Sequence, residues 1–256
     1  MTTTTSTPTD AVSVRPGGHA LITVAPGARR ARVGLRGAGI VPWLVSRGPA
    51  SASVAIGAGG ALLLGGDAVR LDVRVAAGCS LAIEDVGGTV AYDGEGRLAT
   101  WDVNVSLGPD ARLVWRALPF IVADGALVER SMALSLGPGA SAIVRETLVL
   151  GRTGERGGGI VSRLGVEDPL GPVLVETLRV RGDAPVPGVL GGHRVVDSVI
   201  AVGDAGDPPA DHGQASLLRL ERGGYVVRAV AKDAHTIDLD ELTEAAVREA
   251  GAASRP

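Results

Sequence analysis

The sequence predicts an all-β protein: a layered scaffold of stacked strand pairs, solenoid-like or sandwich-like, with a short C-terminal helix. Short apolar or alternating runs follow one another along the 256 residues, each broken by Gly, Pro or Asp. The 38 glycines fall mostly between these runs, as turn residues do. Aromatic residues make up only 2% of the chain, so Val, Leu, Ile and Ala must build the core.

The clearest predicted strand is Val69–Val75, in which apolar and charged side chains alternate. A period of two gives a strand one buried face and one solvated face. By the same criterion, further strands are predicted at His19–Ala25, Ala31–Leu35, Ser51–Ile56, Ala61–Leu64, Ser80–Ile83, Ser141–Leu150, Ile160–Val166, Val173–Val180, Arg194–Val202, Ala215–Leu220 and Tyr225–Val230.

Tight glycine turns recur at a nearly constant spacing. Gly78, Gly108 and Gly137 each separate two apolar runs, and they lie 30 and 29 residues apart. A period near 30 favours stacked strand pairs, as in a β-solenoid or a layered sandwich. Chance spacing in a Gly-rich β protein is the alternative.

The chain is organised as one domain with a tail. Residues 1–16 are polar and Thr-rich, which predicts a disordered segment. No linker divides residues 17–256, so they are predicted to form a single β domain. Its C-terminal helix is expected at about residues 238–250, because Asp238 and Glu241 are spaced as in a capping box.

Charge and cysteine content narrow the class of partner and the compartment. A net charge of −3 provides no field that would gather nucleic acid. The single cysteine, Cys79, excludes an intrachain disulfide and fits a reducing compartment. The N-terminus lacks a signal-peptide pattern, and no apolar run approaches the ~18 residues that a membrane helix needs. We therefore expect a cytoplasmic protein without nucleic-acid or membrane partners.

Familiar catalytic signatures are missing from the sequence. The chain has four histidines, His19, His193, His212 and His235. They are too far apart for the ligand spacings typical of zinc sites. The chain has no nucleophile elbow and no phosphate-binding loop, and Gly157–Gly159 lacks the lysine and the helix that such a loop requires. No catalytic residue is predicted.

Three carboxylates at or within predicted strands are the candidate functional residues: Asp67, Glu146 and Glu176. A buried carboxylate is costly unless it is paired, hydrogen-bonded or wet. Each could face solvent or pair with a nearby arginine in the chain, namely Arg145, Arg152 or Arg179. Alternatively, they line a water-filled internal path, where carboxylates suit a divalent cation in transit.

Four segments of the chain carry motifs that occur together in one order: Gly65–Gly78 (GGDAVRLDVRVAAG), Leu107–Ala126, Glu146–Glu155 (ETLVLGRTGE) and Leu174–Leu178 (LVETL). In this order they resemble the urease accessory protein family UreD, called UreH in some organisms. The first segment resembles the family's signature strand, and the second resembles its LEWLPQxxIxFxGA block. The third resembles its E/D-x-L-x-LGR-x-x-GE motif with one spacer fewer, and the fourth resembles its LxERL motif. Within these motifs, six residues are expected to have a structural role: Gly65, Gly66, Asp72, Gly78, Gly151 and Arg152.

The chain departs from the family pattern in three places. Val114 replaces the acid before the tryptophan, the lysine expected between Leu81 and Tyr92 is missing, and Gly157 replaces the aromatic residue of GExF. These departures indicate a divergent branch of the family.

The resemblance implies a non-enzymatic, β-rich scaffold. UreD-like proteins bind apo-urease and the helical protein UreF, which recruits the GTPase UreG, and an internal tunnel passes Ni²⁺ to urease. The positions matching polar tunnel residues are Asp67, Thr89, Glu146 and Glu176. On this reading the chain binds no cofactor tightly and handles Ni²⁺ only in transit.

Two other functions stay open. A β-solenoid carbohydrate-active enzyme would need exposed aromatic side chains and paired carboxylates, and the chain has only three Trp, two Tyr and one Phe. A structural β interaction protein without a metal role would show the same apolar partner surface as a scaffold.

Overall fold

The computed structural model describes residues 15–237 and 239–252 of the chain. The predicted tail over residues 1–16 lies outside this part, except for Arg15 and Pro16, which begin strand β1 (Arg15–Ala25). The predicted helix cap Asp238 also lies outside it. The described residues form strands almost throughout, with a short 3₁₀ helix and one α-helix at the end, so the predicted all-β class is confirmed.

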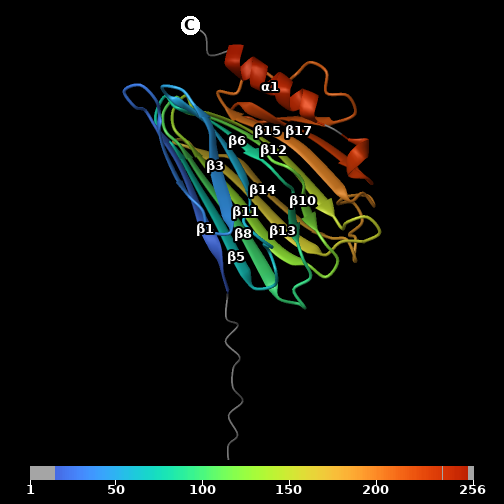
Figure 1. Ribbon diagram of the computed structural model, residues 1–256. Helices are drawn as coiled ribbons and strands as arrows, with labels where there is room; N and C mark the ends of the chain where they lie inside the picture. Colours follow the sequence, from blue (N-terminus) through green and yellow to red (C-terminus); the bar gives the residue numbers. More distant parts are fainter. Residues whose placement is uncertain (1–14, 238, 253–256) are drawn as a thin grey trace, which may run out of the picture.

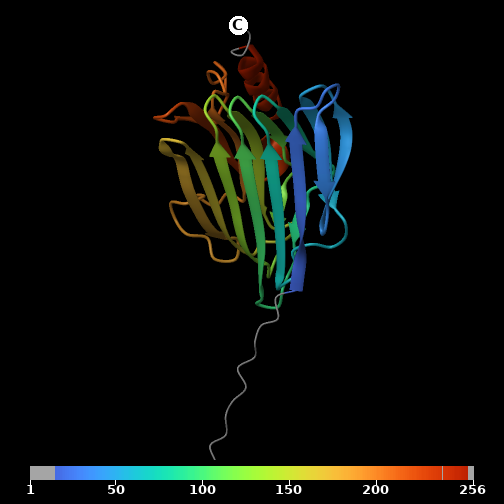
Figure 2. The ribbon, with the colours of Figure 1, turned by 90° about the vertical axis from the view of Figure 1, so that its left-hand side faces the viewer.

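Two sheets face each other across the core (Figures 1 and 2). Sheet A runs in the order β14 (Gly171–Arg181), β13 (Gly159–Asp168), β11 (Leu127–Leu136), β8 (Leu98–Leu107), β5 (Asp67–Val75), β1 and β2 (Arg32–Arg36). Sheet B runs in the order β16 (Ser216–Arg219), β17 (Gly224–Ala231), β15 (Val195–Gly203), β12 (Ser141–Leu150), β9 (Arg112–Arg116), β6 (Ser80–Asp85), β4 (Ser51–Ala58) and β3 (Ile40–Arg47). The short strands β7 (Thr89–Ala91) and β10 (Phe120–Val122) extend sheet B beside β12.

From β5 to β13 the chain coils between the two sheets. Each pass adds a strand parallel to the previous one, so β5, β8, β11 and β13 are neighbours in sheet A, and β6, β9 and β12 are neighbours in sheet B. Val75 lies opposite Leu107, and Leu107 lies opposite Leu136, so one turn of the coil takes about 30 residues. Antiparallel strands close both ends of the coil. The predicted stacking is therefore confirmed.

Two of the three recurrent glycines, Gly108 and Gly137, are explained by the stacking of the turns. The amide of Gly108 donates to the carbonyl of Val75 over 2.8 Å, so one turn sits directly on the next. A Cβ on Gly108 would lie 2.6 Å from the Ala77 nitrogen, and a Cβ on Gly137 would lie 2.6 Å from the Pro109 nitrogen. No side chain fits into this backbone contact at Gly108 and Gly137. Gly78 has a different reason to be glycine: a Cβ there would meet no atom within 4 Å, but its φ is +65°, a left-handed conformation that favours glycine.

The predicted alternation places an aliphatic core between the sheets. Val69, Leu71 and Val73 are fully or almost fully buried, whereas Arg70 and Arg74 on the outer face are exposed; Asp72, on the same outer face, is buried. Burying such a side chain stabilises the fold by roughly 1.5–3 kcal/mol. The core is therefore continuous along the coil.

Helix α1 (Asp240–Ala252) lies on the outer face of sheet B (Figure 1). It begins and ends two residues after the predicted bounds of 238–250. Ala246 and Ala250 pack with Ile143, Val199 and Tyr225 of the sheet. The helix thus covers an apolar strip that the solenoid would otherwise expose.

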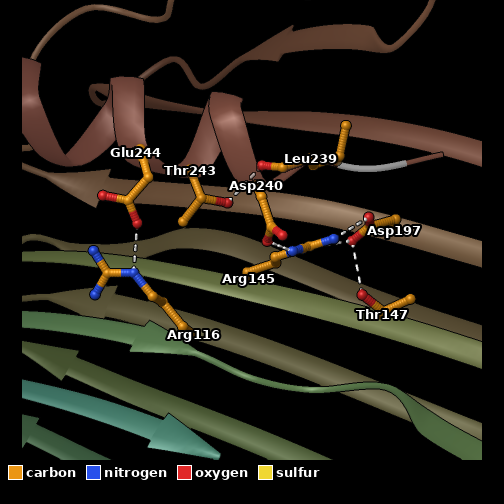
Figure 3. A network of polar contacts seen from close by, with 8 residues as sticks. All are labelled: Arg116, Arg145, Thr147, Asp197, Leu239, Asp240, Thr243 and Glu244. Carbon is orange, nitrogen blue, oxygen red and sulfur yellow. Dashed lines mark hydrogen bonds and ion pairs between the residues drawn. The ribbon is translucent and has the colours of Figure 1, made fainter.

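Two ion pairs fix this helix to the sheet (Figure 3). Arg116 Nε lies 2.7 Å from Glu244 Oε1 at the helix surface. Arg145 pairs with Asp240 in the first helical turn and, through Nη2, lies 2.9 Å from Oδ2 of the buried Asp197. Arg145 therefore connects the helix to a carboxylate within the sheet.

The predicted strand at Ala61–Leu64 is wrong. This stretch is a loop in which Leu63 has a φ of +58° and is fully buried. Left-handed backbone is incompatible with a strand. The loop is anchored from both sides, because the Tyr92 amide donates to the Leu63 carbonyl over 3.1 Å and Leu64 is hydrogen-bonded to Asp67.

Candidate functional site between the sheets

Strand β12 directs Glu146 into the interior. Ala142, Val144 and Leu148 share its alternation and belong to the main core. Glu146 lies opposite Ser198 in β15, which lies opposite Arg228 in β17. A row of three polar residues therefore crosses the inner face of sheet B.

Sheet A contributes a matching set. Arg130 in β11 lies opposite Ser162 in β13, and its Nη1 donates to Ser162 Oγ over 3.3 Å. Glu176 in β14 lies opposite the buried Leu164 of β13. We call the six residues the polar layer: Arg130, Glu146, Ser162, Glu176, Ser198 and Arg228.

Two ion pairs cross the polar layer in opposite senses. Arg130 of sheet A pairs with Glu146 of sheet B. Arg228 of sheet B binds Glu176 of sheet A through two hydrogen bonds of 2.8 and 3.0 Å, and its Nε donates to Ser198 over 2.9 Å. The exposed fraction of the side chains rises from 12% at Arg130 to 33% at Glu176, so the layer runs from the interior toward solvent.

All six members of the polar layer line one small cavity of about 40 Å³. With two carboxylates and two guanidinium groups, the layer is electrically balanced. The arginines suggested by closeness in sequence are the wrong partners. Arg145 directly precedes Glu146, so it lies on the opposite face of β12, where it binds Asp197. Arg179 lies three residues from Glu176, also on the opposite face of its strand, and is exposed.

Asp85 is a further, half-buried carboxylate in the interior, and the sequence reasoning missed it. Its Oδ1 accepts a 3.0 Å hydrogen bond from Trp115 Nε1, and its Oδ2 accepts one of 3.0 Å from the Leu118 amide. Burial raises the pKa of Asp85 to about 6, against the opposing effects of these two hydrogen bonds and of the charge on Arg130. The signal was present in the alternation, because Asp85 is in phase with the buried Leu81 and Ile83.

The other two predicted path residues lie apart from this cavity. The Oδ2 atom of Asp67 accepts a 3.0 Å hydrogen bond from the Leu64 amide, and the Asp67 amide donates to the Leu64 carbonyl over 2.9 Å, so Asp67 fixes the turn into β5. Thr89 begins β7 opposite Phe120, which does line the cavity. The structure thus brings Glu146 and Glu176 together, places Thr89 one strand away, and places Asp67 at the start of β5.

The predicted motif glycines sit where the backbone is crowded or left-handed. A Cβ on Gly65 would lie 2.5 Å from the Cα of Gly94. Gly66, Gly78 and Gly151 have φ values of +91°, +65° and +76°. These conformations favour glycine, so these motif positions serve the turns.

The two charged motif residues hold local structure. Arg152 Nε donates to Glu155 Oε1 over 2.8 Å, and this partner lowers the pKa of Glu155 to about 2. Asp72 lies on the outer face of sheet A, where burial acts to raise its pKa, but hydrogen bonds from Arg70, His19 and Asn104 lower it overall. Both residues are remote from the polar layer.

Within residues 15–237 and 239–252, no three His, Cys, Asp or Glu side chains form a group that could hold a metal ion. The two carboxylates of the cavity each face an arginine instead. In the same part of the chain, no helix combines the length and the apolar character needed to cross a membrane.

The fold and the site define a β-solenoid scaffold of two facing sheets with a charge-balanced polar layer between them. Residues 44–252 match the family described as UreD urease accessory protein. The chain belongs to the UreD family.

Relatives from actinobacteria agree with this assignment. The chain is 33% identical over 240 residues to urease accessory protein UreD of Streptomyces coelicolor, an alignment that covers 84% of this chain and 94% of that protein. It is 34% identical over 200 residues to UreD 2 of Saccharopolyspora erythraea, covering 72% and 70%. It is 43% identical over 143 residues to UreD 1 of Streptomyces griseus, covering 55% of this chain and 56% of that relative.

Proposed function

We propose that this chain is a non-catalytic scaffold in urease maturation that works in the cytoplasm. It binds apo-urease and a UreF-type helical protein, and through the latter a UreG-type GTPase. Membership of the UreD family supports this role. GTP hydrolysis is assigned to the partner, in keeping with a sequence that has no phosphate-binding loop.

The chain's own contribution is to pass Ni²⁺ toward urease between its two sheets. The observation that carries this proposal is that Glu146 and Glu176, far apart in sequence, line one internal cavity. Carboxylate oxygens are suitable ligands for a divalent cation. Because each carboxylate is paired with an arginine, the cation is held weakly and released, as a conduit requires.

Asp67 and Thr89 remain proposed members of the same path. Asp67 shares the inward phase of the buried Val69 and Leu71, so its carboxylate lies on the side of β5 that faces sheet B. Thr89 lies beside Phe120 at the cavity wall. The path would therefore run along the inner face of the coil.

The carbohydrate alternative is disfavoured by the position of the aromatic side chains. Trp101, Trp115, Phe120 and Tyr225 are buried, which leaves only Trp43 and Tyr92 exposed, at 46% and 37%. Neither of these two lines the cavity that holds the paired carboxylates. Sugar-binding grooves need such rings at the surface, so we do not propose an enzyme.

The proposal is tested by complementation. In a host that carries a urease operon with its own UreD gene deleted, we expect this chain, supplied with its native UreF-type and UreG-type partners, to restore urease activity. It should also co-purify with the UreF-type partner. A chain that folds but neither restores activity nor co-purifies would contradict the scaffold role.

A further inference from the structure

The polar layer is closed in this structure. A cavity of about 40 Å³ has room for about three waters, at roughly 10–15 Å³ of such volume per water. A divalent cation with its full hydration shell does not fit. Glu146 is moreover already occupied by the guanidinium of Arg130.

We propose that Arg130 gates the layer: it occupies Glu146 in the closed state and must leave before Glu146 can take a divalent cation. This inference rests on the proposed nickel path. Arg130 is then a positioning residue, which acts on the cation only through the carboxylate that it covers or uncovers. A divalent cation and the Arg130 guanidinium exclude each other at Glu146, because both are positively charged and the cavity is too small to hold them together.

Arg130 suits this role better than Arg228. Arg228 is held by both oxygens of Glu176 and by Ser198, so each of its three nitrogens has a partner. Arg130 is the more buried of the two arginines, yet its Nε has no hydrogen-bond partner among the protein atoms of the described residues. A buried donor left unpaired makes the closed position less than fully satisfied.

The surroundings also leave Arg130 a place to go. Its guanidinium carbon lies 5.5 Å from the centre of the Phe120 ring, a cation–π contact that does not depend on the hydrogen bond to Glu146. The carboxylate of Asp85 also lies within the electrostatic reach of Arg130. On leaving Glu146, the guanidinium therefore does not lose all negative charge nearby.

The test is the affinity of the purified full-length chain for Ni²⁺, measured by calorimetric titration with NiCl₂ alone. Arg130→Met should bind Ni²⁺ about tenfold or more tightly than the parent. The gain should vanish in the double variant Arg130→Met/Glu146→Gln. A merely structural ion pair would lose stability when broken but would gain no Ni²⁺ binding through Glu146.

Two further variants keep the test decisive. Arg163→Met is the control. Arg163 of β13 pairs with Glu129 of β11, the residue next to Arg130, at 3.3 Å and with both side chains 45% exposed. It should bind Ni²⁺ as the parent does. If Arg130→Met does not fold, Arg130→Lys keeps the charge without the two-pronged geometry, and we expect an intermediate gain of about threefold.

Two results would overturn the gate. One is the absence of any gain in Arg130→Lys and in folded Arg130→Met, and the other is a gain that persists without Glu146. Complementation by the unmodified chain separates this failure from failure of the proposed function. If the parent restores urease but the variants gain no Ni²⁺ binding, the gate is wrong and the scaffold role stands.

Discussion

Arg130 of sheet A and Glu146 of sheet B form an ion pair that spans the space between the sheets, with side chains only 12% and 17% exposed. Removing one partner of a buried pair leaves the other charge uncompensated. Together with the pair between Arg228 and Glu176, it ties the two sheets to each other at the edge of the aliphatic core.

Arg130→Met should therefore lower the free energy of unfolding by about 3–5 kcal/mol. The double variant Arg130→Met/Glu146→Gln should recover much of that loss, because no buried charge is left alone. Urea denaturation measures both. Arg163→Met, in the exposed pair with Glu129, should cost only about 0–1 kcal/mol. If Arg130→Met and Arg163→Met lost the same free energy of unfolding, the polar layer would be more accessible to water than it is in the structure.

The stacked turns predict a second difference in stability. Gly108→Ala forces a Cβ to within 2.6 Å of the Ala77 nitrogen, so the two turns must separate. We expect a loss of about 1–3 kcal/mol, the range for overpacking. Gly60→Ala is the control, since a Cβ there meets no atom within 4 Å, and it should change the thermal midpoint little. A Gly108→Ala variant as stable as Gly60→Ala would refute the turn contact.

The half-buried carboxyl of Asp85 should give the protein a characteristic pH dependence. Its pKa is about 6 in the folded chain, above the ordinary value of 3.8, so the folded state binds the proton more tightly. The resulting stabilisation is complete below pH 3.8 and is lost as the pH rises through 6. It amounts to at most about 3 kcal/mol.

The free energy of unfolding of the parent and of Asp85→Asn is measured by denaturation between pH 4.5 and 8. As the pH rises, the parent should lose stability relative to Asp85→Asn. A difference that stays constant over this range would mean that Asp85 is solvated. The comparison with Asn cancels the contributions of the other titrating groups.

The attachment of helix α1 depends on Arg145 more than on Arg116. Arg145 joins Asp240 to the buried Asp197, whereas Glu244 is 49% exposed. Hydrogen exchange of the helix amides should rise markedly in Arg145→Met and hardly in Glu244→Gln, whose ion pair is worth about 0–1 kcal/mol. Equal protection in the two variants would show that the apolar contacts of Ala246 and Ala250 suffice to hold the helix.

Local sequence pattern was enough to predict most of the strands and their stacking, but not strand β3 (Ile40–Arg47). Alternation in Val69–Val75 indicates which face is buried, and Gly108 and Gly137 mark a backbone contact that recurs from coil to coil. The loop at Ala61–Leu64 was predicted as a strand, because nothing in an apolar run of residues indicates the left-handed backbone at Leu63. The Asp67 side chain, which holds that turn, was taken only as a path residue.

The partners inside the polar layer could not be read from the sequence. Glu146 binds Arg130 and Glu176 binds Arg228, and each arginine comes from the facing sheet. Such contacts depend on how the coil brings the sheets together, and this is not encoded in neighbouring positions. That Glu146 and Glu176 deserve attention was predictable, because a carboxylate in phase with a core face needs a partner.

The nickel content of urease shows whether Glu146 and Glu176 pass the metal between the sheets. Urease is purified from the complemented host with the parent chain, with Glu146→Gln/Glu176→Gln, or with the exposed control Glu129→Gln, and nickel is quantified per active site. We expect urease to contain several-fold less nickel with Glu146→Gln/Glu176→Gln than with the parent or with Glu129→Gln. The double variant should still co-purify with the UreF-type partner. Full nickel loading by the double variant would contradict the path between the sheets.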